Sequence, residues 1–438
     1  MSPTLVKDIK SFENDYRVTS QIVGTGGQGT VYVAVHQSTG EARACKVIPL
    51  KGTRLSNREA STILSQPDTT HSAEASVHVG EEAGMTSVVG ARLCKLRNEY
   101  TILKDLIHPN IVTVERVFVT THHICIMEEL VTGGDLLSFM EHKNEQLREP
   151  QCAVIILQVL KAAEYLHAKN VVHRDIKPDN ILMTSWKDGA RVVLTDFGHA
   201  RSMKSSHRRG AATRMFTTVG TLGYTAPEVH RLYTTLHGET GYSMAVDMWS
   251  IGTITALLMT GALIFPGNEG DESEQKLSKL RAAAKCDLSA IDQSKGRWAL
   301  VTKRGKAFVK ALLVLDEKKR LTATQALQHS WLSCAAYADE LNTVYESAIE
   351  NWRPRTTAGD VVHTDDNSAS PVPPVHVRNK AVESTFFTEQ HASAVHPASV
   401  SQRQYSTTPY SDNLLYNRKR WLKSKGALNI SPDLGPDP

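Results

Sequence analysis

Residues 173–180 read HRDIKPDN and form the most informative segment of the chain. The segment places a carboxylate, a cation and an amide close together, at Asp175, Lys177 and Asn180, after the apolar pair 171–172. Transfer of a phosphoryl group to a hydroxyl needs such a set, because a carboxylate accepts the proton, a lysine neutralises the phosphate and an amide oxygen holds Mg²⁺. An ordinary polar surface loop would rarely match every position. The segment therefore predicts a site for phosphoryl transfer.

A second acidic position follows in the segment Asp-Phe-Gly at 196–198, after the strand-like apolar run 192–194. Mg²⁺ prefers oxygen ligands, and Asp196 can supply one or two of them. A turn of this composition after a strand is common by itself. Its position 21 residues after Asp175 is informative, and it predicts that both aspartates serve one site.

Upstream, residues 24–31 read GTGGQGTV, a run of the form GxGxxGxV. Glycines allow backbone N–H groups to approach phosphates closely. The run alone is weak evidence, and in a dinucleotide-binding domain it would open into a helix. Here the flanks alternate like strands, as at Val31, Val33 and Val35. The run therefore predicts a glycine-rich hairpin over a nucleotide.

Lys46 lies on the strand predicted after this hairpin and is followed by apolar Val47 and Ile48. A lysine in apolar surroundings needs a phosphate or a carboxylate as its partner. Glu99 is the candidate, because it lies in an amphipathic helix predicted over 91–107. Two simpler interpretations stay open, in which Lys46 is a surface lysine of an edge strand and Glu99 is an exposed helix residue.

In their order along residues 16–333, these motifs resemble those of a protein kinase of the Ser/Thr type. The segment Ala-Pro-Glu at 226–228 matches the end of the activation segment, and 247–252 matches the buried helix that anchors the catalytic loop. Arg320 matches the arginine that pairs with the glutamate of Ala-Pro-Glu. The run 320–331 is similar to the calcium/calmodulin-dependent kinase-like group.

The resemblance implies an α+β fold of two lobes, a small and mainly antiparallel sheet lobe with one key helix and a larger helical lobe. The expected division of the chain is a leader at 1–16, a kinase domain at 17–333 and a C-terminal extension at 334–438. Within the domain, the small lobe spans 17–130 with an insertion at 51–90, and the large lobe spans 131–333. The extension is expected to hold a helix, docked on the large lobe through an apolar stripe at 337–352, and then a mostly disordered tail.

For the chemistry, the resemblance implies that Asp175 is the catalytic base and that Lys177 contacts the γ-phosphate. Thr221 matches the threonine that braces the base in Ser/Thr kinases. Lys177 after Ile176 also follows the Ser/Thr pattern, so serine or threonine acceptors are expected.

The implied cofactors are ATP and Mg²⁺. Asn180 and Asp196 would hold the metal, and Lys46, oriented by Glu99, would hold the α- and β-phosphates. In the adenine pocket, Met127 resembles the gatekeeper and the backbone of Glu128 would read the adenine edge. The other positions expected around the nucleotide are Val23, Gly24, Gly26, Gly29, Val31, Ala44, Leu130, Asp135 and Leu182.

The resemblance also implies a mode of activation and a substrate preference. Arg174 matches an arginine that usually pairs with a phosphate on the activation segment, so Thr217 is proposed as a switch site with Thr218 as the alternate, phosphorylated by an upstream kinase or by the protein itself. Both could instead be plain loop threonines. Asp135 and Asp179 stand where basophilic kinases bind an arginine, which suggests substrates of the form Arg-x-x-Ser/Thr.

Composition limits the other classes of function. The chain has 438 residues and a net charge of +4, too small an excess to indicate a dedicated nucleic-acid binder. Six cysteines without CxxC spacing argue against a disulfide framework or a zinc site. Residues 1–10 lack the apolar core of a signal peptide, and the longest apolar stretch, 251–265, is interrupted and shorter than the ~18–20 residues of a membrane span. An intracellular protein of the cytoplasm, the nucleus or both is expected.

The sequence bears on two other classes of protein and on several roles for the basic cluster at 418–425. A pseudokinase acting as a scaffold or allosteric partner would typically lose the phosphate lysine, the catalytic aspartate or a metal ligand, and this sequence keeps them all. A non-kinase nucleotide-binding module is disfavoured because no helix follows 24–31. The basic cluster at 418–425 suits a nuclear-import signal, a membrane-surface patch or a calmodulin-binding helix, with a solvated tail as the simpler interpretation.

Overall fold

The computed structural model describes residues 6–7, 15–26, 29–49, 99–119, 123–143, 147–203, 215, 220–230, 242–266, 272–293, 296–335, 337–355 and 360–363. The expected insertion at 51–90, the expected switch residues Thr217 and Thr218, and the basic cluster at 418–425 lie outside these ranges.

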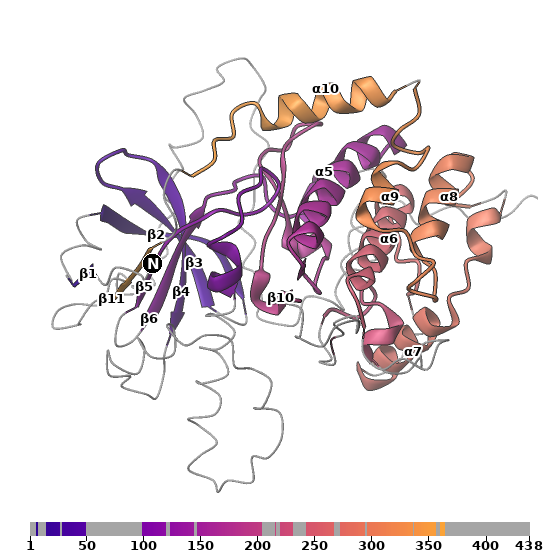
Figure 1. Ribbon diagram of the computed structural model, residues 1–438, viewed down its shortest axis with the longest axis horizontal. Helices are drawn as coiled ribbons and strands as arrows, with labels where there is room; N and C mark the ends of the chain where they lie inside the picture. The colour runs from indigo at the N-terminus through magenta and orange to yellow at the C-terminus, as the bar shows by residue number, and fades with distance from the viewer. Residues whose placement is uncertain are drawn as a thin grey trace, which may run out of the picture.

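The small lobe is a single twisted sheet (Figure 1). In spatial order, its strands in the described chain are β1 (Val6–Lys7), β11 (Asp360–His363), β5 (Val114–Val119), β6 (His123–Glu129), β4 (Ala42–Pro49), β3 (Gly29–His36) and β2 (Tyr16–Gly26). The pairs from β5 to β2 are antiparallel, whereas β11 joins β5 and β1 joins β11 in parallel. The antiparallel part confirms the expected sheet lobe, and the two parallel edge strands were not predicted.

Alternation along the strands gives this sheet two different faces. The outer face is covered by one apolar cluster, which contains Tyr16, Tyr32, Ala34, Cys45, Val47, Phe118, Cys125 and Met127. Ala44 and Lys46 alternate with Cys45 and Val47 on β4, so they lie on the opposite face. That inner face is turned toward the helix at 99–103, which carries Glu99.

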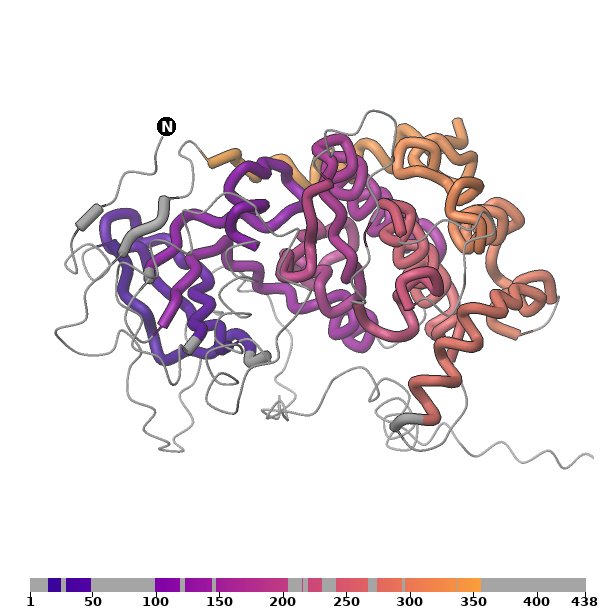
Figure 2. Tube along the Cα trace, turned by 60° about the horizontal axis from the view of Figure 1, so that its bottom comes forward, coloured from indigo at the N-terminus to yellow at the C-terminus, as the bar shows by residue number. Residues whose placement is uncertain are grey.

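The large lobe is helical, and Figure 2 shows it beside the sheet lobe. Its helices are α4 (Leu136–His142), α5 (Glu149–Ala168), α6 (Ala245–Thr260), α7 (Glu272–Lys285), α8 (Lys303–Leu312) and α9 (Ala323–Leu327). Among the residues that the structure describes, the large lobe also contains two pairs of short antiparallel strands. Strand β7 (Val171–Val172) pairs with β10 (Arg201–Ser202), and β8 (Ile181–Met183) pairs with β9 (Val192–Leu194). The two lobes confirm the α+β kinase architecture that the resemblance implies.

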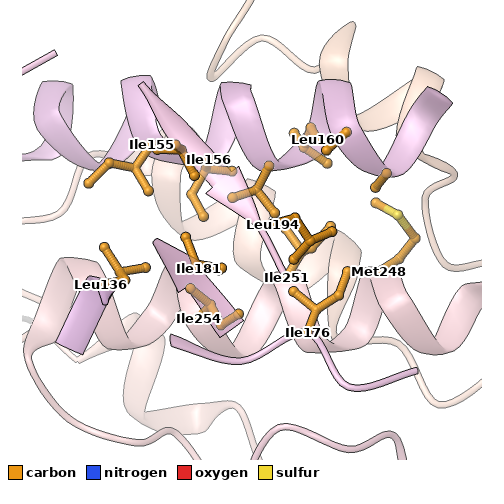
Figure 3. Packing of buried hydrophobic residues seen from close by; sticks show 14 of the residues in the cluster. Leu136, Ile155, Ile156, Leu160, Ile176, Ile181, Leu194, Met248, Ile251 and Ile254 are labelled. Atoms are coloured by element: carbon orange, nitrogen blue, oxygen red, sulfur yellow. The ribbon is translucent and has the colours of Figure 1, made fainter. Parts of the chain in front are cut away.

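The centre of the large lobe is an apolar contact between α5 and α6. Figure 3 shows Ile156 and Leu160 from α5 facing Ile251 of α6, with Ile181 of β8 and Leu194 of β9 packed between the helices. All of these side chains are fully buried. The strands that hold the catalytic segments are therefore fixed from behind by a rigid apolar layer.

The C-terminal extension returns to the small lobe. Helix α10 (Ala338–Ile349) packs against α5 (Figure 1), with the Lys161 ammonium 4.4 Å from the centre of the Tyr345 ring. This helix confirms the one expected from the stripe at 337–352. After this helix, residues 360–363 form β11, which pairs with β5. The tail that was expected to be mostly disordered lies beyond residue 363, outside the described ranges. Within the described residues, no helix is both long enough and apolar enough to cross a bilayer.

Candidate active site

The predicted catalytic loop, residues 173–180, is anchored by Asp247, near the start of α6. Its carboxylate, which is fully buried, accepts hydrogen bonds from the backbone N–H groups of His173 at 3.0 Å and Arg174 at 2.8 Å. It also lies 2.9 Å from Nε2 of His167 on α5. Burial alone would raise the pKa of Asp247, but the hydrogen bond and charge of His167, the charge of His173 and the Arg174 N–H together lower it. The loop geometry is therefore set by one ionised side chain.

Asp175 is held by three side chains predicted from the sequence. Thr221 Oγ1 donates a hydrogen bond of 2.9 Å to Asp175 Oδ1, and Lys177 Nζ lies 3.1 Å from Asp175 Oδ2 and donates to Thr221 Oγ1 at 2.8 Å. Asn180 Nδ2 donates to the Asp175 carbonyl at 2.8 Å and to Oδ2 at 3.2 Å. The four residues form one connected network around a buried carboxylate.

Asp196 begins the turn after β9. Its backbone is left-handed, with φ of 59°, and its side chain accepts a hydrogen bond from the Gly198 N–H at 3.4 Å. The Thr195 N–H donates to the Asn180 carbonyl at 2.9 Å, so Asp196 and Asn180 lie on adjoining segments. A carboxylate and an amide oxygen are hard ligands of the kind Mg²⁺ takes, and this ion usually keeps several waters and binds few protein groups. Among the described residues, no three His, Cys, Asp or Glu side chains gather as a metal site.

Lys46 and Glu99 form an ion pair between the sheet and the helix at 99–103. Lys46 Nζ lies 3.0 Å and 3.3 Å from the two Glu99 carboxylate oxygens, and the Glu99 side chain is 2% exposed. Burial favours the neutral form of Lys46, but the charges of Glu99, Glu128 and Asp196 outweigh burial and raise its pKa. The simpler interpretations, a surface lysine and an exposed helix glutamate, are wrong.

One expectation for the adenine pocket is wrong by one residue. Met127 lies opposite Cys45 and is buried in the cluster on the outer face of the sheet, so its side chain cannot face the cleft. Glu128 lies opposite Ala44 on the inner face instead. Glu128 is paired on both sides, with Ala44 in β4 and Val114 in β5, so its backbone belongs to the ladder. Leu130 lies just beyond the end of β6, and the Glu128 side chain lies on the inner face of the sheet.

The glycine-rich hairpin spans the turn from β2 to β3. Gly24 pairs with Val31 and Gly26 with Gly29, and Val31 lies opposite Lys46, on the inner face. A Cβ on Gly29 would lie 2.2 Å from the Val47 carbonyl oxygen, so only glycine fits there. The expected strand–turn–strand form is confirmed.

The remaining expected positions lie at the edge of the large lobe or on the hairpin. Asp135 and Leu182 form an isolated backbone bridge, and Asp135 Oδ1 accepts from the Ser138 N–H at 2.7 Å at the start of α4. Val23 on β2 is exposed. The structure thus brings together the lysine, the carboxylates and the glycine hairpin, and the contacts of these residues with a nucleotide stay predictions.

Two contributors to this framework were not predicted from the sequence. His167 on α5 contacts Asp247, and no local motif marks it. Arg355, beyond α10, reaches the small lobe, where its guanidinium donates to the Val114 carbonyl at 2.6 Å. Neither position carries a sequence signal, because each acts through a polar contact with a segment distant in the sequence.

Comparison with known proteins gives an independent result. The protein kinase domain family matches residues 85–332. The chain is 31% identical over 339 residues to meiosis-specific serine/threonine-protein kinase mek1 of Schizosaccharomyces pombe, covering 76% of this chain and 62% of that protein. It is 35% identical to myosin light chain kinase A of Dictyostelium discoideum (60% and 81%) and 36% identical to human calcium/calmodulin-dependent protein kinase type IV (54% and 46%). The chain spans less than two thirds of the first and third of these relatives.

Proposed function

Because the chain belongs to the protein kinase family, with serine/threonine kinases as relatives, we propose that it transfers the γ-phosphate of Mg-ATP to serine and threonine hydroxyls of protein substrates. The observation that carries the proposal is the network in which Thr221 and Lys177 converge on the Asp175 carboxylate. It combines a proton acceptor, a cation and a positioning hydroxyl within hydrogen-bond distance of each other.

In the proposed reaction, the oxygen of the substrate hydroxyl bonds to the γ-phosphorus, and Asp175 accepts the proton of that hydroxyl. The bond from the γ-phosphorus to the bridging oxygen breaks, and ADP leaves. Lys177 offsets the negative charge on the transferred group, while Thr221 keeps the Asp175 carboxylate turned toward the substrate. Asn180 and Asp196 would hold Mg²⁺, which when bound neutralises phosphate charge.

The nucleotide would lie between the lobes. Lys46 is fixed by Glu99 and would contact the α- and β-phosphates, below the backbone of the glycine-rich hairpin. Val31 and Ala44 line the inner face of the sheet and would cover one side of the adenine, with Leu182 on the other side. Each expected contributor lies on an element fixed by the sheet or by the α5–α6 core.

The alternative of a pseudokinase scaffold predicts a damaged site. The lysine, its glutamate partner, the aspartates and the asparagine are all present, and the lysine pairs with its glutamate while the asparagine bonds Asp175. This integrity favours catalysis over a purely structural role.

Asp175→Asn tests the reaction, because asparagine keeps the size of the side chain but cannot take up the proton. Removal of a general base lowers rates by about 10²–10⁴-fold, and Mg-ATP should still raise the melting temperature of the variant. Asp188→Asn is the matched control, since Asp188 is a part-exposed acid bonded to Lys143 and Gln151. Transfer by Asp175→Asn at the rate of this control would rule out the mechanism.

We further propose a preference for basic substrates. Burial raises the pKa of Asp179, Lys177 opposes this, and the charges of Asp135 and Asp175 add to it. An arginine on the substrate would relieve this crowding of carboxyls. Peptides with and without arginine three residues before the acceptor should differ in kcat/KM, and Asp179→Asn should reduce that difference. Equal kcat/KM for the two peptides would rule out the preference.

Phosphorylation of Thr217, or of Thr218, is proposed as the activating step. Arg174 donates to the Tyr242 hydroxyl at 3.1 Å, and the backbones of Tyr242 and Met215 bond to each other at 2.9 Å. Arg174 is thus linked through Tyr242 to the described residue just before the proposed switch, and a phosphate there would meet a cation. Replacing both threonines by alanine should lower turnover, and unchanged turnover would reject the switch.

A further inference from the structure

The inner face of the small-lobe sheet carries a carboxyl group where it forms the back of the proposed adenine pocket. Glu128 lies opposite Ala44 on β4, and Lys46 is two positions further along that strand. Side chains two positions apart on a strand share a face, so Glu128, Ala44 and Lys46 point to the same side of the sheet. Ala44 carries only a methyl group, so the position opposite Glu128 on β4 holds no large side chain.

The charged groups that act electrostatically on Glu128 come from three elements. Lys46 belongs to β4, Glu99 to the helix at 99–103, and Asp196 to the turn after β9. Burial raises the pKa of Glu128 to about 7, the charge of Lys46 opposes the rise, and those of Glu99 and Asp196 add to it. Glu129 differs, because its carboxylate is paired with Arg191.

We propose that Glu128 is a specificity-determining residue of the nucleotide pocket, whose carboxylate accepts a hydrogen bond from an amino group on the base and disfavours a base with a carbonyl oxygen at that position. This inference rests on the proposed binding of ATP between the lobes. An ionised carboxylate offers only acceptors. It therefore matches the 6-amino group of adenine and opposes the 6-oxo group of guanine or hypoxanthine.

The expected discrimination is large. A site built to bind a donor rejects the analogue that lacks it, since a polar group is then left without a partner. Protonation of Glu128 weakens this preference, because a neutral carboxyl can donate a hydrogen bond to a carbonyl oxygen of the base. Preference for the amino base should therefore be strongest above neutral pH and weaken as the pH falls toward 6.

The test compares kcat/KM for ATP and inosine triphosphate, which differs from ATP in carrying a 6-oxo group. Glu128→Gln keeps the length of the side chain but adds an N–H₂ donor, and Glu128→Leu removes both functions. The ratio of ATP to inosine triphosphate should fall at least tenfold in Glu128→Gln, and its dependence on pH between 6 and 8 should disappear. Glu129→Gln, the adjacent residue, is the matched control and should keep the ratio of the unaltered protein.

A ratio of two nucleotides measured on one sample does not depend on the fraction of the variant that is folded. An unchanged ratio in both Glu128 variants would overturn the inference, as would an equal loss of discrimination in Glu129→Gln. Failure of the proposed function would look different, because the unaltered protein would then transfer no phosphate from either nucleotide.

Discussion

The guanidinium of Arg355 donates a hydrogen bond of 2.6 Å to the carbonyl oxygen of Val114, at the start of β5. Its second terminal nitrogen donates to the Leu103 carbonyl at 3.4 Å. Leu103 closes the helical segment 99–103 that carries Glu99, so one side chain from beyond α10 joins that helix to the sheet. A cation at the C-terminal end of a helix also complements the helix dipole.

Replacing Arg355 with methionine should weaken this connection between the helix at 99–103 and the sheet. Both carbonyls would lose a charged donor, and hydrogen bonds to charged groups contribute about 1.5–3 kcal/mol. We expect a lower melting temperature and a KM for ATP several-fold higher, because the helix at 99–103 would be held less firmly. Arg355→Lys should restore part of both properties, since a lysine can bond one carbonyl.

The control for Arg355 is Arg353→Met. Arg353 is exposed, and its guanidinium bonds the nearby carbonyls of Glu350 and Trp352. Equal KM values for ATP in the Arg353 and Arg355 variants would show that the hydrogen bonds of Arg355 do not position the helix at 99–103.

Breaking the ion pair of Lys46 and Glu99 should harm both stability and transfer. Lys46→Met leaves the Glu99 carboxylate buried without its partner, which costs about 3–5 kcal/mol. The double variant Lys46→Met with Glu99→Gln removes that charge and should be more stable than Lys46→Met alone in urea unfolding, although it remains inactive. Full transfer by Lys46→Met would contradict the proposed phosphate contact.

Thr221→Ala should lower kcat more than it changes KM for ATP. The hydroxyl bonds both Asp175 and Lys177, so its loss frees the carboxylate and leaves the Lys46–Glu99 pair intact. A fall of roughly 10–100-fold corresponds to a charged hydrogen bond. Thr221→Ser keeps the hydroxyl and should recover most of kcat, and a serine variant as slow as the alanine variant would argue against the bracing role.

Asp247→Asn should alter how stability depends on pH. The folded-state pKa of Asp247 lies below its ordinary value, so its carboxylate contributes stability above that value and loses it as the pH falls through the folded-state pKa. The unaltered protein should be the more stable one at neutral pH, and its advantage in free energy of unfolding should shrink between about pH 5 and pH 3. A constant difference over this range would show that the charge of Asp247 does not matter.

The residues of the catalytic network were predictable because their spacing in short loops leaves little freedom. Asp175, Lys177 and Asn180 lie within one segment and Asp196 follows in a second short motif, whereas Thr221 was implied by the resemblance to Ser/Thr kinases. A lysine among apolar neighbours requires a partner, and the resemblance to protein kinases identified Glu99 as that partner of Lys46, 53 positions away.

The phase of β6 was not predictable. The run from Ile124 to Met127 is apolar at every position, so no alternation shows which side chains face inward. An error of one residue then exchanges the two faces of the sheet, as happened with Met127 and Glu128. Strands β1 and β11 were missed for a different reason, since such short segments have no periodicity. Strand β11 pairs with the edge of β5, and β1 pairs with β11.

The position of β11 has a consequence for how the protein is made. Sheet strands β2 to β6 leave the ribosome early, but the edge of β5 waits for residues 360–363, which are synthesised after the whole helical lobe. An unpaired strand edge is a site for unwanted association until it is covered. A chain that stops short of β11 would therefore leave this edge open, and its first defect should be aggregation of the small lobe.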